Sequence, residues 1–182
     1  MAKGSGGARN YAKTSTFKKR EDEFNSLILS GNYDKKRSMM AKSGGFVVTH
    51  NDHDKIINHE KDKSDIASEL LAKKGYKVYL DSEKSQIDGV KMPDGRIYKT
   101  VMDIKTINEA GNNTIKNRIR EAGKQGAEVA ILYQNTKAMD KTYVENQIND
   151  FSGFKDDNSM RVKMVIVVGM SGNIHRHIIK RK

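Results

Sequence analysis

Two short and almost wholly apolar runs constrain the fold of this chain more than any other feature. They are residues 128–134 (EVAILYQ) and 162–169 (VKMVIVVG), and their length and composition are typical of buried strands. A helical pattern precedes each of them, at 114–125 and at 141–151. A strand–helix–strand crossover of this kind places strands side by side with helices packed on the sheet. We therefore expect an α/β fold in which a mixed β-sheet is flanked by helices.

The rest of the chain supplies further helices and strands. Apolar residues at helical spacing predict helices over 18–30 and 54–74, and Gly75 is the stop signal of the second. Alternating or apolar runs predict the remaining strands, and a Pro-Asp-Gly turn at 92–95 joins the third strand to the fourth. These strands are expected at 46–48, 76–80, 85–90, 97–107 and 174–181, the last as an edge strand.

Length and composition limit the domain organisation. The 182 residues suit one domain with tails, and we expect a basic, partly disordered extension with a short helix over 1–43, followed by a single domain over 44–182. The absence of cysteine excludes disulfides and thiol nucleophiles. No run approaches 18 apolar residues, so we expect no membrane partner and a cytoplasmic protein, in a bacterial or phage-infected cell.

Positive charge gathers at the two ends of the chain. The formal net charge is +11, while the middle of the chain is close to neutral. Basic ends on a near-neutral body suit a polyanion, because lysine and arginine release condensed counterions when they contact phosphates. Nucleic acid is therefore the expected partner. The charged residues of the ends are Lys3, Arg9, Lys13, Lys18, Lys19, Arg20, Arg176, Lys180, Arg181 and Lys182.

The segment from Asp88 to Lys105 carries the residues best suited to chemistry. Alternation along a strand places Asp103 and Lys105 on one face and turns Ile104 toward the core. Pairing of the predicted strands would bring Asp88 close to Asp103. Two aspartates and a lysine that converge can bind Mg²⁺ or Mn²⁺ and activate water for attack on a phosphate. The alternative is an ordinary solvated ion pair on an exposed sheet face.

A resemblance bears on this choice. The run from Leu71 to Val78 (LAKKGYKV), the DIKT sequence at 103–106 and Gln125 resemble the PD-(D/E)xK nuclease superfamily. The chain is most similar to the C-terminal tRNase toxin domains of bacterial contact-dependent inhibition proteins, and to related nuclease domains of phages and mobile elements. The likeness extends over residues 44–134 and implies a restriction-endonuclease-like core and metal-assisted hydrolysis of phosphodiester bonds.

The resemblance also implies a role for individual residues. Asp88 would be the first metal carboxylate, Asp103 the second and Lys105 the catalytic lysine, although no proline precedes Asp88. An acidic residue on the first core helix often completes such sites; we prefer Glu69, and the alternatives are Asp65 and Glu60. Gln125 matches a glutamine at an active-site position. The implied cofactor is Mg²⁺ or Mn²⁺, with Zn²⁺ as an alternative, and a protein inhibitor is a further implied partner.

Two weaker patterns remain. Basic residues on the helix at 114–125 would hold the phosphates on either side of the cleaved bond, unless they form an ordinary solvated helix face. These residues are Lys116, Arg118, Arg120 and Lys124. Three histidines, His50, His53 and His59, lie within ten residues, where they could act as metal ligands or as a base; we interpret them as loop and helix-surface histidines.

The sequence thus predicts a metal-dependent endonuclease that hydrolyses phosphodiester bonds in nucleic acid, and the resemblance points toward tRNA or other RNA. Two alternatives from other classes stay open. One is a catalytically inactive nucleic-acid-binding protein with the same fold, and the other is a structural protein of a phage or mobile element. Neither the choice between RNA and DNA nor the oligomeric state follows from the sequence.

Overall fold

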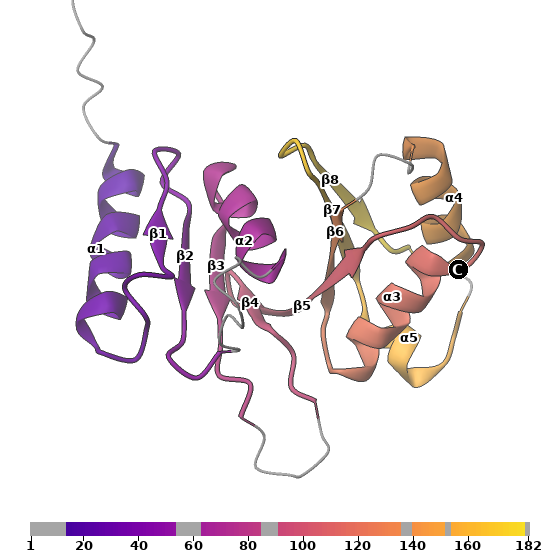
Figure 1. The fold of residues 1–182 in the computed structure, drawn as a ribbon, viewed down its shortest axis with the longest axis horizontal. Helices are drawn as coiled ribbons and strands as arrows, with labels where there is room; N and C mark the ends of the chain where they lie inside the picture. The colour runs from indigo at the N-terminus through magenta and orange to yellow at the C-terminus, as the bar shows by residue number, and fades with distance from the viewer. Residues whose placement is uncertain (1–13, 54–62, 85–90, 136–139, 152–153, 181–182) are drawn as a thin grey trace, which may run out of the picture.

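The structure is a computed structural model that describes residues 14–53, 63–84, 91–135, 140–151 and 154–180. Its centre is one eight-stranded sheet in which the strands lie in the order of the sequence (Figure 1). The strands are β1 (Met39–Met40), β2 (Phe46–Thr49), β3 (Lys77–Leu80), β4 (Gly95–Ile97), β5 (Thr100–Ile107), β6 (Val129–Gln134), β7 (Met164–Gly169) and β8 (Ile174–Ile178).

The pairing of the strands confirms a mixed sheet. β2 pairs parallel with β3, and β5, β6 and β7 are parallel to one another. The other neighbours are antiparallel, and β8 forms an edge, as predicted. The helices that connect β5 to β6 and β6 to β7 are therefore the expected crossovers.

The sequence interpretation was wrong about the region before β5. Residues 97–107 form no single strand, because the chain reverses at Tyr98 and Lys99 and pairs Ile97 with Thr100. The antiparallel partner of β5 is therefore β4. The strand expected at 85–90 lies outside the described residues.

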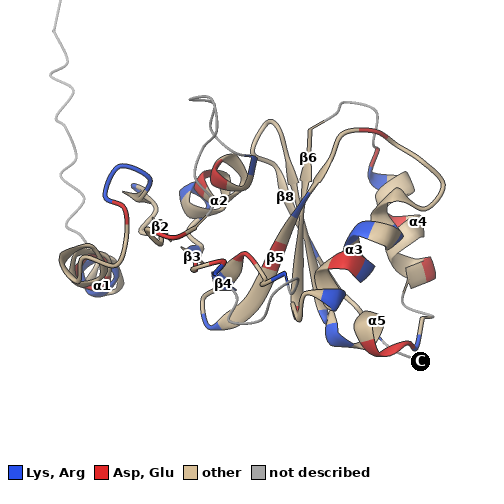
Figure 2. Cartoon of the chain, turned by 60° about the horizontal axis from the view of Figure 1, so that its bottom comes forward, with Lys and Arg blue, Asp and Glu red and all other residues tan. Residues whose placement is uncertain are grey.

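The described residues form five helices around this sheet. They are α1 (Ser15–Leu29), α2 (Lys63–Lys73), α3 (Thr114–Lys124), α4 (Lys141–Phe151) and α5 (Asp157–Arg161). Figure 2 shows α2 on one side of the sheet and α3, α4 and α5 on the other. α4 has the predicted bounds, whereas α5 and β1 were not predicted. Among the described helices, none is long and apolar enough to cross a membrane.

Alternation along the strands separates two cores. Ile104 of β5 and Ile131 of β6 belong to the cluster beneath α2, with Ala67 and Leu71 of that helix. Residues of the opposite parity pack on the other side, against Ile115, Ile119 and Ala122 of α3. A third cluster joins Phe46, Val48 and Tyr79 to Phe24, Leu27 and Ile28 of α1. The face opposite α2 is thus covered by α1 at one end and by α3 and α4 at the other.

Between α1 and α3, the same face of the sheet carries polar side chains. β3, β4 and β5 place Tyr79, Arg96 and Asp103 on this face, since each alternates with a residue of the α2 core. Gly95 allows β4 to lie close to β3 here, because a Cβ at this position would lie 1.9 Å from the carbonyl oxygen of Tyr79. Tyr79, Arg96 and Asp103 therefore form a polar stretch of the sheet beside the end of α3.

Candidate active site

Asp103 and Lys105 form the centre of the polar stretch. They lie on one face of β5, as alternation predicts, and Lys105 Nζ is 2.6 Å from Oδ2 of Asp103. The Asp103 side chain is fully buried, and neither of its carboxylate oxygens has a well-aligned hydrogen-bond donor among the described residues, although the ammonium of Lys105 and the backbone N–H of Asp94 approach it and lower its pKa. The lysine contact is therefore an ion pair without good hydrogen-bond geometry. A buried carboxylate in this state costs free energy and calls for an explanation.

Asp94 is the second carboxylate of the site. It directly precedes β4, one position beyond the Gly95–Met102 pair, and therefore lies opposite Asp103. Its Oδ2 accepts a hydrogen bond of 2.6 Å from the backbone N–H of Ile104. This bond fixes the Asp94 carboxylate at the side of Asp103.

Both carboxylates are costly to ionise. Burial, reinforced by the charge of Asp94, raises the pKa of Asp103 to about 6, although Lys105 acts in the opposite direction. Burial also raises the pKa of Asp94, although the hydrogen bond from the N–H of Ile104 and the charge of Lys105 act to lower it. Two buried acids beside each other are in an unfavourable arrangement that a bound cation would stabilise.

Gln125 completes the contacts of Lys105. It is the residue that follows α3, and its Oε1 accepts a hydrogen bond of 2.5 Å from Lys105 Nζ. The ammonium of Lys105 is thus held between Asp103 and Gln125, with its side chain 18% exposed. The structure therefore brings together three of the predicted residues: Asp103, Lys105 and Gln125.

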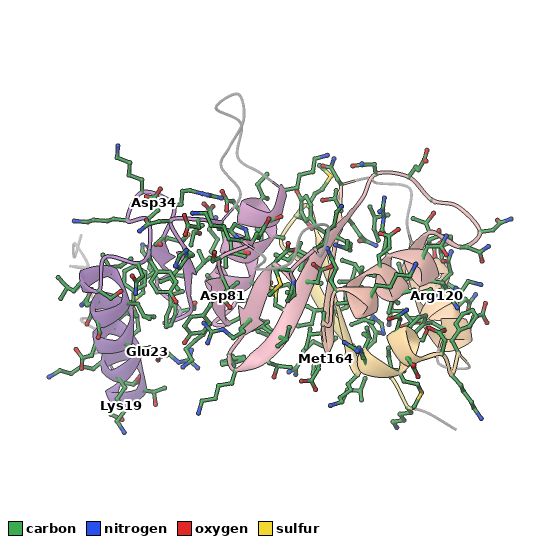
Figure 3. The ribbon with its side chains drawn as sticks, turned by 90° about the horizontal axis from the view of Figure 1, so that it is seen from below. Lys19, Glu23, Asp34, Asp81, Arg120 and Met164 are labelled. Atoms are coloured by element: carbon green, nitrogen blue, oxygen red, sulfur yellow. The ribbon has the colours of Figure 1, made fainter. Side chains whose placement is uncertain are left out.

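A positively charged residue stands beside the carboxylates. Arg96 lies two residues after Asp94 on the same face, and its guanidinium forms a two-point ion pair with Asp81 at 2.7 and 2.8 Å. The guanidinium also lies over the Tyr79 ring, 4.8 Å from its centroid. In Figure 3, Asp81 lies between Glu23 of α1 and the hairpin β4–β5. These contacts fix Arg96 while leaving 40% of its side chain exposed.

His53 differs from its sequence interpretation. It is 1% exposed and is therefore no surface histidine. Its Nδ1 lies 2.8 Å from the carbonyl oxygen of Asp81 and 3.2 Å from Oε1 of Glu83. His53 and Glu83 are close enough for their charges to act on Asp94. His50 is partly exposed and packs edge-on against Tyr33, and His59 lies outside the described residues.

The first predicted metal carboxylate cannot be compared with this geometry. Asp88 and Glu60 lie outside the described residues. Glu69 lies on α2 and approaches Lys73 at 4.0 Å. Within the described ranges, no three histidine or acidic side chains converge closely enough to enclose a metal ion. The described arrangement is therefore a pair of carboxylates, Asp94 and Asp103.

Asp94 was not among the predicted site residues, although its sequence context carries a signal. Pro93-Asp94 stands nine residues ahead of Asp103-Ile104-Lys105, and a Pro-Asp pair is the first half of the motif after which the PD-(D/E)xK superfamily is named. Pro-Asp-Gly is also a strong turn signal, and the turn interpretation was preferred. Locating the hairpin at Tyr98 would have placed Asp94 opposite Asp103.

Asp65, one of the alternative helix acids, has a structural contact. Its carboxylate receives hydrogen bonds from Nε and Nη2 of Arg37 at 3.2 to 3.3 Å, and the two side chains are 8% and 13% exposed. Arg37 also donates to the carbonyl oxygen of His53 at 3.2 Å. The pair therefore ties α2 to the segment between α1 and β2.

We expect Asp65→Asn to lower the free energy of unfolding by about 3 kcal/mol, because it leaves a nearly buried arginine without its counter-charge. Asp150→Asn is a matched control, since Asp150 is 67% exposed and its contact with Lys116 at 3.5 Å is a surface pair. Urea denaturation of both variants measures the difference. Equal, small losses would show that the Arg37–Asp65 pair contributes little.

The predicted phosphate-binding residues lie on α3 as expected, and three of them contact acids. Lys116 lies 3.5 Å from Asp150, Arg118 2.8 Å from Glu121 and Arg120 3.0 Å from Asp156. Lys124 is exposed in the last turn, next to Gln125. A polyanion would have to compete with the acids for the first three.

The two carboxylates suit a divalent metal ion. Mg²⁺ commonly uses one or two protein carboxylates and takes its other ligands from water and phosphate, so it requires no complete protein cage. The two buried oxygens of Asp103 without aligned donors supply such ligands. The oxygen-only set formed with Asp94 favours Mg²⁺ or Mn²⁺ over softer ions.

Comparisons with known proteins bear on the same region. No curated protein matches the chain. The sequence profile of the contact-dependent growth inhibition CdiA C-terminal domain matches residues 91–174, a range that contains Asp94, Asp103, Lys105 and Gln125. Among solved structures, a chain of the CdiA-CT/CdiI toxin and immunity complex from Burkholderia pseudomallei is similar, with a TM-score of 0.50 and 19% identity. The match covers 72% of this chain and 98% of that one, and the two share a mixed α/β fold.

Proposed function

We propose that the chain is a metal-dependent nuclease of the PD-(D/E)xK type that hydrolyses phosphodiester bonds in nucleic acid. The observation that carries the proposal is the pair of buried carboxylates, Asp94 and Asp103, with Lys105 held against Asp103. A fully buried acid without aligned donors weakens the fold, and an ion that it binds with substrate would compensate for this cost.

Each residue of the site has a distinct role in this proposal. Asp94 and Asp103 would hold the divalent ion, which would supply charge neutralisation at the phosphate and would lower the pKa of a water molecule that it binds. Lys105 presents its ammonium beside the carboxylates, where it stabilises negative charge that develops on the phosphate. Gln125 orients that ammonium through its hydrogen bond. Arg96, fixed by Asp81 and partly exposed, provides a contact for a neighbouring phosphate.

A toxic role and a protein inhibitor are part of the proposal. The matched family is named for the C-terminal domain of contact-dependent growth inhibition proteins, and the similar solved structure is a toxin bound to its immunity protein. We infer that this chain is likewise a toxin-type nuclease and is restrained by a specific protein. The basic ends of the chain would add affinity for the nucleic acid.

The test is a cleavage assay with purified protein on total tRNA, messenger RNA and plasmid DNA. We expect cleavage with Mg²⁺ or Mn²⁺, with Zn²⁺ as a third arm, and none in EDTA. Circular dichroism under both conditions separates loss of activity from loss of folding. Nucleic-acid binding without cleavage by any metal would reject the nuclease and leave a binding protein, whose affinity should fall steeply with salt.

A further inference from the structure

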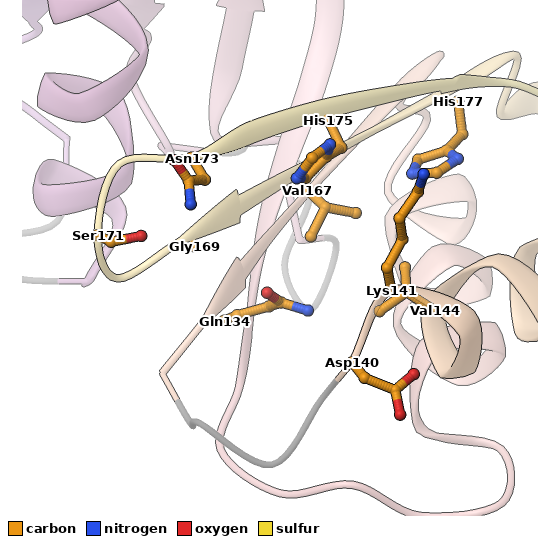
Figure 4. A pocket seen from close by; sticks show the side chains of 10 residues that line it. All are labelled: Gln134, Asp140, Lys141, Val144, Val167, Gly169, Ser171, Asn173, His175 and His177. Carbon is orange, nitrogen blue, oxygen red and sulfur yellow. The ribbon is translucent and has the colours of Figure 1, made fainter.

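A second concave site lies away from the carboxylates, between α4 and the end of the sheet formed by β6, β7 and β8. Its volume is about 160 Å³ (Figure 4). Val144 and Val167 form an apolar wall, and Gln134 and Asn173 bring side-chain amides to it. Figure 4 shows Lys141, His175 and His177 on the side where β8 passes α4. None of these residues belongs to the proposed catalytic centre.

The strand register explains why these side chains meet. His175 lies opposite Val167, and His177 lies opposite Val165, whose side chain belongs to the core beneath α3 and α4. Alternate residues of β8 therefore direct both imidazoles to the α4 side of the sheet. Lys141 is the first residue of α4 and faces them across the pocket.

Three basic side chains, Lys141, His175 and His177, meet at the pocket, together with the carboxylate of Asp140. Burial, His175 and Lys141 together lower the pKa of His177, while Glu145 acts in the opposite direction. The nearby acids are already engaged: Glu145 lies 3.6 Å from Lys141 Nζ, and Oδ1 of Asp140 accepts a hydrogen bond of 2.7 Å from the backbone N–H of Tyr143. An anion at this position would pair with Lys141 and would favour the protonated form of His177, against the burial that lowers its pKa.

The volume and the lining residues of the pocket favour an anion that contains an aromatic ring. A protein cavity of about 150 Å³ accommodates benzene, so a space of about 160 Å³ suits one heterocyclic ring. The valines offer an apolar surface, and the amides of Gln134 and Asn173 can both donate and accept hydrogen bonds, as the edge of a nucleobase requires. Imidazole rings also stack on unpaired bases.

We propose that this pocket binds one unpaired nucleotide of the nucleic-acid substrate. The base enters between Val144, Val167 and the amides, and the phosphate lies against Lys141 and His177. The proposal deepens the nuclease function and rests on it for the identity of the substrate. It adds that the substrate presents a single-stranded nucleotide some distance from the cleaved bond.

The position of the pocket relative to Lys105 is consistent with a substrate subsite. Lys105, Leu132, Val167 and His175 form one row across β5, β6, β7 and β8. Three strand spacings separate the ends of this row, a distance of at least about 14 Å. Because Leu132 is buried beneath α3, a polynucleotide that reaches both sites must pass around that helix. The basic residues Lys116, Arg118 and Arg120 lie on α3.

The test measures binding of AMP, GMP, CMP and UMP, and of their deoxy forms, to the full chain in EDTA, where the proposed cleavage does not occur. Inorganic phosphate and free nucleosides are the comparison probes. We expect at least one nucleotide to shift the ring NMR signals of His175 and His177 and to leave those of His50 unchanged. Lys141→Ala should weaken its binding at least about tenfold, whereas Lys155→Ala, an exposed lysine outside the pocket, should not change it.

The outcomes separate this proposal from the nuclease function. Nucleotide binding that shifts His175 and His177 supports the pocket even if the chain cleaves nothing, and any preference for ribose or deoxyribose then names the substrate. Active protein whose His175 and His177 signals do not respond to millimolar nucleotide would overturn the pocket alone. Equal responses to phosphate and nucleotides would overturn the role of the base.

Discussion

Replacing Asp103 by asparagine is expected to lower cleavage at least about a hundredfold without unfolding the protein. The amide has nearly the shape of the carboxylate but cannot serve as an anionic metal ligand. Asp103 is fully buried beside Lys105, so the substitution acts at the centre of the site. Steady-state cleavage of the best substrate at saturating Mg²⁺ measures the loss.

The stability of the same variant distinguishes catalysis from folding. Burial raises the pKa of Asp103 from 3.8 to about 6, so the folded state holds a proton more tightly than the unfolded state does. The ionisation of Asp103 should therefore lower the free energy of unfolding of the parent protein in EDTA by roughly 3 kcal/mol as the pH rises from about 4 to above 6. Asp103→Asn should lack this part of the decline and be no less stable than the parent at pH 7.

Asp157→Asn is a suitable control because Asp157 is exposed in the first turn of α5. It should retain cleavage and the pH profile of the parent. An Asp103→Asn protein that folds and still cleaves at the parental rate would contradict the proposed site. A variant that fails to fold would instead contradict the idea that the charge of Asp103 weakens the fold.

The predictable part of the fold came from local periodicity. The helix at 141–151 and the strands near β6 and β7 follow from regular apolar spacing, and the structure gives α4 the predicted bounds. The hairpin β4–β5 was missed because its turn residues, Tyr98 and Lys99, carry none of the glycine, asparagine or aspartate signals of tight hairpins. Tyr98 nevertheless has a φ of 54°, a conformation that non-glycine residues rarely adopt.

The candidate site was predictable to the extent that it lies on one strand. Asp103 and Lys105 share a face because side chains alternate along β5, and this needs no tertiary information. The carboxylate that lies opposite Asp103 depends on the register between β4 and β5. The turn predicted at 92–95 gave a different register from the turn observed at Tyr98 and Lys99, so Asp94 was not recognised as that carboxylate. The burial of His53 was also beyond sequence reasoning, because its contact with Asp81 joins the end of β2 to the end of β3.

The choice between Asp94 and Asp88 is the sharpest remaining test of the site. We expect Asp94→Asn to lower cleavage about as much as Asp103→Asn, because both carboxylates would hold the same ion. Asp94 is fixed by the N–H of Ile104, and the amide oxygen of asparagine can accept the same hydrogen bond, so the variant should fold. Asp88→Asn is the matched comparison, and we expect it to retain more activity.

The double variant strengthens the comparison. Residues that act as one unit give strongly non-additive losses, so Asp94→Asn combined with Asp103→Asn should be little worse than either substitution alone. Mn²⁺ binding, followed by the broadening of NMR signals near the site, should be lost in both single variants, since each removes one of the two proposed carboxylate ligands. If Asp88→Asn abolishes cleavage and Mn²⁺ binding while Asp94→Asn preserves them, Asp88 is the partner of Asp103. Asp94 would then serve only to hold the backbone of β5 through Ile104.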